Sequence, residues 1–148
     1  MPGGVRLRSR LAPLLVLIVP FLTAALSGCF SGGGGGGPGS VELTIDFNGE
    51  SPQGGVGGSG VWTFTEVEIE EGETVFSLLL KASEMYNFTV KYHKERYGVF
   101  VEAIAGVEGG GSKWWVYYVN DVFGEVASDR KVVEDGDEIL WIYSEGAI

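Results

Sequence analysis

The length of 148 residues allows one domain and excludes a second of enzyme size, because domains usually need roughly 100 to 200 residues. Apolar residues make up 45% and aromatic residues 12%, which excludes an intrinsically disordered chain. A formal net charge of −10 argues against a nucleic-acid partner, since proteins that bind phosphate backbones need a basic surface. One cysteine and one histidine exclude an internal disulfide framework and the usual zinc sites.

The first 28 residues are predicted to be a signal peptide. Three arginines and no acidic residue precede an apolar run at 11–26, which is shorter than the roughly 20 residues of a membrane-spanning helix. The run leads into Leu26-Ser27-Gly28-Cys29, which resembles the lipobox of prokaryotic lipoproteins. The resemblance implies that the Cys29 thiol carries a diacylglycerol. The alternatives are an uncleaved anchor and an ordinary cleaved signal, and both also place the rest of the chain outside.

Residues 29–40 are predicted to be the lipidated cysteine and a flexible tether. The tether contains six consecutive glycines at 32–37 and cannot bury apolar area. Cleavage before Cys29 would leave 7 basic and 20 acidic residues, a balance of −13. Anionic lipid headgroups repel such a domain, so we expect the lipid to anchor it at the cell membrane, facing outside.

The folded part is predicted to span 41–145. Strict alternation of apolar and polar residues over 41–47 and again over 61–70 predicts two strands joined by a long glycine-rich loop. Gly72 ends the second strand, and Thr74 is a candidate N-cap for a helix from Val75 to about Met85.

Three or four strands are expected after the helix. The pattern predicts strands at 88–92, 97–105, 113–120 and 132–143, the last interrupted by a turn at 134–137. Residues 93–96 and 106–112 are predicted to be a turn and a loop, and Asn120-Asp121 a tight turn. This order predicts an α+β fold, in which a mixed sheet of about five or six strands wraps around one main helix.

The chain resembles the transcobalamin-like C-terminal domain family. The resemblance covers about 105 residues, departs at Asp121 where the family usually has glycine, and rests on five segments in order: 72–79, 98–106, 114–120, Gly124 and 134–143. It implies a β-grasp-like ligand-binding domain. Such domains occur on prokaryotic surface proteins, and in animal transport proteins they form the smaller lobe that closes over cobalamin. The larger helical lobe of those proteins has no counterpart here.

The aromatic strand at 114–119 carries the candidate ligand site. Alternation places Trp114 and Tyr118 on one face and Trp115 and Tyr117 on the other, and a domain with a single core cannot bury both sets under its own helix. One set is expected to be covered by a loop, to form a subunit contact, or to stack on a ligand. The predicted ligand-binding residues are Trp114, Trp115, Tyr117 and Tyr118 as a platform, with Gly109, Gly110 and Gly111 as its rim. The alternative for the glycines is a flexible hairpin tip.

The remaining polar clusters are predicted to be structural. The acidic residues at 134–138 suit a turn better than a cation site, and those at 66–73 suit a solvated strand face. His93 is interpreted as a surface residue. Asn87-Phe88-Thr89 is a sequon, which makes Asn87 a candidate for glycosylation if the host modifies exported proteins; the alternative is a chance match, since sequons are common.

Two functions remain open, and no enzyme activity, metal or cofactor is expected. The first is capture of a small ligand, such as a corrinoid or another large planar or sugar-like molecule. The second is a structural or adhesive surface module that docks another protein through the aromatic face or a sheet edge.

Overall fold

The computed structural model describes residues 38–145 except Ser59. The predicted signal peptide, Cys29 and the tether up to residue 37 lie outside the described residues. Within the described part of the chain, no helix is both long enough and apolar enough to cross a membrane.

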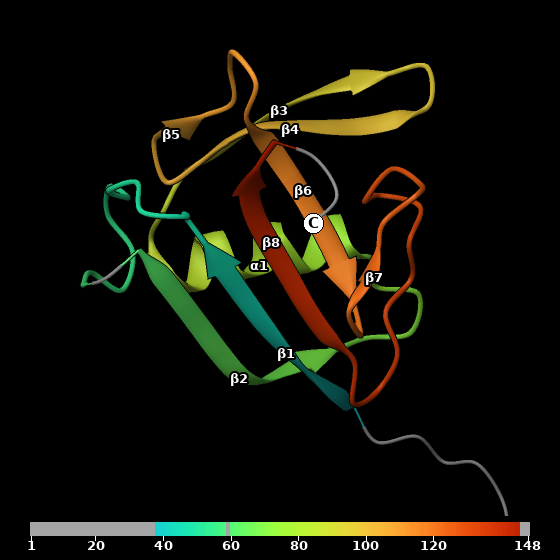
Figure 1. The fold of residues 1–148 in the computed structure, drawn as a ribbon. Coiled ribbons are helices and arrows are strands. Elements are labelled where there is room, and N and C mark those ends of the chain that lie inside the picture. The colour runs from blue at the N-terminus through green and yellow to red at the C-terminus, as the bar shows by residue number, and fades with distance from the viewer. Residues whose placement is uncertain (1–37, 59, 146–148) are drawn as a thin grey trace, which may run out of the picture. The chain divides into compact units, whose positions relative to one another are not determined.

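A five-stranded mixed sheet forms the larger layer of the domain (Figure 1). The strand order is β2-β1-β8-β6-β7, in which β1 and β8 are parallel and the other neighbours are antiparallel. The prediction of a mixed sheet is therefore confirmed. The strands span Gly39–Asp46 (β1), Val61–Ile69 (β2), Trp114–Val119 (β6), Val122–Phe123 (β7) and Glu138–Ser144 (β8).

One helix, α1 (Val75–Tyr86), crosses behind this sheet (Figure 1). Thr74 is its N-cap, as predicted: the Ser77 backbone N–H donates to Thr74 Oγ1 at 3.1 Å, and the Thr74 N–H donates to Ser77 Oγ at 2.8 Å. Leu78 and Leu79 are completely buried against the sheet, so packing adds to the stability that the cap provides.

The strands after the helix do not all join the larger sheet, which corrects the single-sheet prediction. β3 (Val90–Glu95), β4 (Gly98–Ile104) and β5 (Val107–Glu108) form a second, antiparallel sheet in the order β3-β4-β5. Ala105 and Gly106 both have left-handed φ angles, of 50° and 79°, and this tight turn folds β5 back onto β4. Since β4 pairs with β3 and β5, its two edges are occupied within the smaller sheet.

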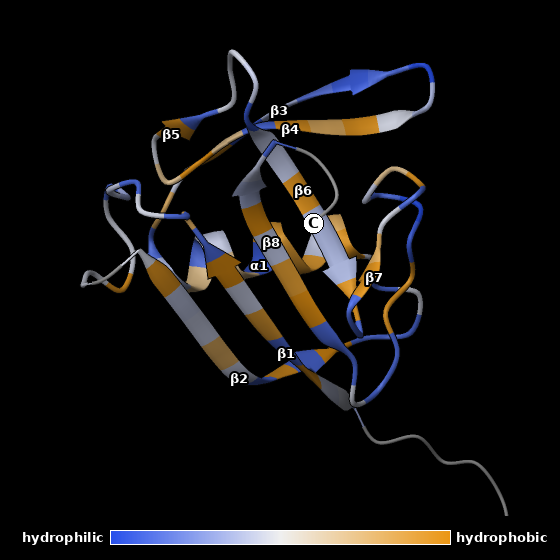
Figure 2. Cartoon of the chain, in the orientation of Figure 1, coloured by the Kyte–Doolittle hydropathy of each residue, from blue (hydrophilic) through white to orange (hydrophobic). Residues whose placement is uncertain are grey.

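The smaller sheet has an inner and an outer face. Val101 and Ile104 of β4 are buried in the common core, whereas Phe100 and Glu102 point outward. Strand β3 continues through Glu95, so the turn predicted at 93–96 is wrong, and the chain reverses at 96–97 instead. Figure 2 shows β3 as largely hydrophilic, which fits a strand at the edge of a sheet.

The Asn120-Asp121 turn is confirmed. Both residues have left-handed φ angles, of 51° and 63°, as a two-residue type I′ hairpin requires. Asp121 adopts this conformation without glycine. The aromatic strand β6 therefore reverses directly into β7, and the two pair between Tyr118 and Phe123.

Candidate functional site

The four aromatic rings of β6 do not form one open platform. Trp114 is 41% exposed, whereas the exposed fractions of Trp115, Tyr117 and Tyr118 are 8% or less. Trp115 Nε1 donates to the Val107 carbonyl at 2.8 Å, and the Tyr117 hydroxyl donates to the Val126 carbonyl at 2.7 Å. These bonds satisfy the polar atoms of two rings that belong to the core.

Tyr118 points to the face opposite the helix, where it is covered locally. Its ring meets Phe123 edge to face, at a centroid separation of 5.6 Å. Of the three expected kinds of cover, Tyr118 therefore has the first: it is covered by the protein's own chain. Trp114 is left as the ring of this strand that a ligand could reach.

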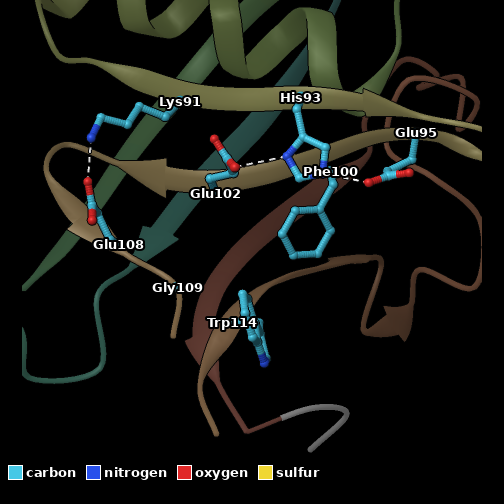
Figure 3. A pocket seen from close by; sticks show the side chains of 8 residues that line it. All are labelled: Lys91, His93, Glu95, Phe100, Glu102, Glu108, Gly109 and Trp114. Atoms are coloured by element: carbon cyan, nitrogen blue, oxygen red, sulfur yellow. Dashed lines mark hydrogen bonds and ion pairs between the residues drawn. The ribbon is translucent and has the colours of Figure 1, made fainter. Parts of the chain in front are cut away.

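Trp114 lies in a groove of about 640 Å³ on the outer face of the smaller sheet (Figure 3). The groove combines two aromatic rings with five charged or titratable side chains from three strands. Its lining residues are Lys91, His93 and Glu95 of β3, Phe100 and Glu102 of β4, Glu108 of β5, Gly109, and Trp114 of β6.

Strand alternation brings the β3 side chains into this groove. Lys91, His93 and Glu95 are two residues apart and share the outer face. Tyr92 points the other way and packs edge to face on Phe76 of α1 at 4.7 Å. The strand is thus held by an aromatic contact on its inner face and presents polar groups on its outer face.

Phe100 and Trp114 form what we call the aromatic corner. Their centroids are 5.6 Å apart and their planes are inclined by 64°. His93 is paired with Phe100 in the sheet register, and its ring lies 5.3 Å from the phenyl ring. The corner thus joins the first residue of β6 to the outer face of the smaller sheet.

Gly109 supports the indole of Trp114 from the backbone. A Cβ atom at Gly109 would lie only 2.8 Å from Trp114 Cε3, so glycine permits this close approach. Its N–H donates to the Glu102 carbonyl at 2.7 Å. Gly110 and Gly111 are exposed and lie in the hairpin tip that follows. This tip is closed by a hydrogen bond of 2.9 Å, which the Gly110 N–H donates to the Lys113 carbonyl. Of the predicted rim, only Gly109 lines the groove.

The polar side of the groove consists of two ionic clusters. His93 Nδ1 lies 2.9 Å from Glu102 Oε1, and His93 Nε2 lies 2.8 Å from Glu95 Oε1. Lys91 and Glu108 form an ion pair at the other end (Figure 3). With a neutral imidazole these five groups carry a net charge of −2, and with a protonated one −1.

The clusters shift the pKa values of their members. The hydrogen bond with Glu95, and after it the one with Glu102, raises the pKa of His93 above its ordinary value of 6.5. The pKa of Lys91 is raised, and that of Glu108 lowered, by the hydrogen bond and charge of their mutual pair. All of these groups are exposed to solvent, which screens their interactions.

Sequence reasoning missed the polar side of the groove because it placed His93 in a turn. The alternation of β3 continues through Lys91, His93 and Glu95, and this was the available signal. Nothing local indicates that Phe100 meets Trp114, since this contact joins two sheets.

The acidic segment before β8 is built as a turn. Asp137 accepts hydrogen bonds from the Glu134 N–H at 2.8 Å and from Asn120 Nδ2 at 2.7 Å, and Asp135 accepts one from the Ser40 N–H at 2.8 Å. Across residues 38–145, Ser59 apart, no three or more His, Cys, Asp or Glu side chains are grouped to hold a metal ion. Asn87 of the sequon is the exposed, left-handed C-cap of α1.

Comparison with known proteins identifies a family that matches the sequence and solved structures that share the fold. A family described as a domain of unknown function (DUF4430) matches residues 72–145, which is half of the chain. No curated protein matches.

Two solved structures share the fold at low sequence identity. A "putative metal binding protein" from Ruminococcus gnavus ATCC 29149 is 17% identical, with a TM-score of 0.52, and the match covers 73% of this chain and 98% of that one. Haptocorrin in complex with Cbi is 18% identical, with a TM-score of 0.57, over 73% of this chain and 25% of haptocorrin. The chain therefore spans about a quarter of the length of haptocorrin.

Proposed function

The chain belongs to the DUF4430 family and contains a transcobalamin-like domain, and we propose that it is an extracytoplasmic lipoprotein that binds a small organic molecule in the groove at Trp114. The lipid at Cys29 would anchor the protein to the cell membrane. The tether would hold the domain outside. The proposal includes no catalytic step.

The exposure of Trp114 carries this proposal. The other three tryptophans of the chain are 5% exposed or less, so Trp114 differs from them in being held open at a groove. Ligand sites combine aromatic walls with a few convergent polar groups, and their volumes are usually about 300 to 1,000 Å³. A groove of about 640 Å³ with an aromatic corner and two ionic clusters fits this description.

A corrinoid is the first ligand to test. The support is the shared fold with haptocorrin, whose structure is a complex with Cbi. The aromatic corner offers a flat organic ligand a surface for stacking. A glycan is the second class, since sugar rings also stack on exposed indoles.

Tryptophan fluorescence of the purified full-length protein tests the proposal directly. Excitation near 295 nm during titration with cobinamide, cobalamin and a glycan panel should reveal a ligand that quenches the emission of Trp114. The same titration of Trp114→Phe should show the response to a colourless glycan lost, because the three remaining tryptophans are buried, and a lower affinity for a corrinoid, whose absorption quenches buried tryptophans as well. Absence of any response across the panel, with Trp114 still open to acrylamide, would contradict binding at this groove.

A protein-docking module is the alternative function, and a separate surface favours it. Val122 and Val126 are both exposed and line a hollow of about 290 Å³ beside the edge strand β7. A second copy of the chain could cover this hollow. Light scattering over a range of protein concentrations should then show a dimer that Val126→Asp abolishes, whereas a strict monomer counts against it.

A further inference from the structure

We propose that the groove takes an organic cation, whose alkylated ammonium group sits in the aromatic corner of Phe100 and Trp114. This inference rests on the proposed function and names the ligand class of the same groove. It follows from the geometry of the two rings, from the charge of the polar side, and from the hydrogen-bond acceptors of the polar side that remain free.

The aromatic corner has the geometry of an open cage for a cation. Ring faces attract a cation that lies within about 6 Å of their centroids, and indole is the most effective ring. With centroids 5.6 Å apart and an inclination of 64°, the rings of Phe100 and Trp114 can both approach one bound group. Phe100 is 36% exposed, so both walls of the corner are open to solvent.

The charge of the groove favours a cation. Three carboxylates line it, against one lysine and one histidine, so its net charge is negative in either state of His93. The whole chain is acidic as well, with a formal charge of −10, and a negative field raises the local concentration of cations.

The hydrogen-bonding capacity of the polar side points the same way. Glu108 takes one of the three N–H donors of Lys91, and carboxylates take both nitrogens of His93, which leaves two N–H groups of Lys91 and the indole N–H of Trp114 as the donors of the groove. A carboxylate has about four lone-pair sites, and most of those on Glu95, Glu102 and Glu108 remain free. The groove can thus accept hydrogen bonds and positive charge more readily than it can donate, which disfavours anions and gives a neutral sugar few donors.

Choline and its neutral isostere 3,3-dimethylbutan-1-ol are the matched probes. They have nearly the same shape, so a difference in affinity reports the charge. We expect choline to quench Trp114 with an affinity at least about tenfold higher than that of the neutral isostere. Glycerophosphocholine, the soluble headgroup of a lipid, is a third probe. If it binds more tightly than choline, the natural ligand is a lipid headgroup; if it binds more weakly, the natural ligand is a free organic cation.

Three substitutions locate the charge effect. Glu102→Gln keeps the shape of the side chain and should weaken choline binding about threefold, whereas Lys91→Gln removes a competing cation and should strengthen it by a similar factor. Glu68→Gln makes the same change on β2, away from the groove, and should leave the affinity within about twofold. Circular dichroism of each variant confirms that the fold is retained.

The outcomes separate this inference from the proposed function. If the neutral isostere binds as well as choline, or if only uncharged members of the wider panel quench Trp114, the cation inference is overturned and small-molecule binding stands. If choline binds equally to Glu102→Gln and Glu68→Gln variants, the assigned polar side is overturned. If no compound in either panel affects Trp114, both proposals fall.

Discussion

Replacing Gly109 by alanine tests whether the glycine backbone holds the Trp114 indole in the groove. The new Cβ would lie 2.8 Å from Trp114 Cε3, whereas ordinary contacts begin at 3.4 Å. The indole must therefore move by about 0.6 Å or rotate away from its rotamer, at a cost of roughly 0.5 to 1.5 kcal/mol. Backbone strain adds nothing, because the φ angle of Gly109 is not in the left-handed region.

Gly110 provides a matched control one residue away. It also lacks a left-handed φ angle, and a Cβ placed there meets no atom within 4 Å. Gly110→Ala should therefore be neutral or stabilise the domain by up to about 1 kcal/mol, since alanine restricts the unfolded chain. The two variants should therefore differ by about 0.5 to 2.5 kcal/mol in the free energy of unfolding.

Thermal unfolding followed by circular dichroism measures this difference. For a domain of this size, 1 kcal/mol corresponds to about 4 °C or more in Tm, with Gly109→Ala the lower. Acrylamide quenching should also change in Gly109→Ala alone, because the indole is displaced. Equal Tm values and equal quenching in the two variants would refute the assigned contact.

Three further perturbations have definite expected results. Gly124→Ala places a Cβ 2.1 Å from Cζ of the buried Tyr117 ring and should lower the free energy of unfolding by about 2 to 4 kcal/mol in a urea titration; a loss below 1 kcal/mol would contradict this packing. An NMR titration of His93 should have its midpoint above pH 6.5, and Glu95→Gln should move it back towards 6.5. Because the folded-state pKa of His93 is raised, the stability that its ion pairs with Glu95 and Glu102 provide is present below about pH 6.5 and is lost as the pH rises through the folded-state pKa. A midpoint that Glu95→Gln leaves unchanged would contradict the role of Glu95. Cys29→Ala should abolish partition of the protein into detergent, and a native protein whose mass shows no lipid would disprove the anchor.

Local sequence signals predicted much of the secondary structure. The strict alternation at 41–47 predicted β1, and the sequence around Thr74 predicted the start of α1, because strand periodicity and helix capping depend on residues close together in the chain. The Asn120-Asp121 turn was predictable for the same reason. The ordered motifs from Gly72 to Tyr143 indicated a transcobalamin-like domain, and the fold shared with haptocorrin supports this interpretation.

The groove, in contrast, depends on contacts between distant segments. Alternation indicated that Trp114 and Trp115 face opposite ways, but not which of them is buried, because burial is decided by the elements that pack on each face. Trp115 is covered where its indole reaches Val107 of β5, and Trp114 stays open where it meets Phe100 of β4. Both outcomes follow from the pairing of β3, β4 and β5 as a separate sheet, and this pairing is selected by the packing of the whole domain.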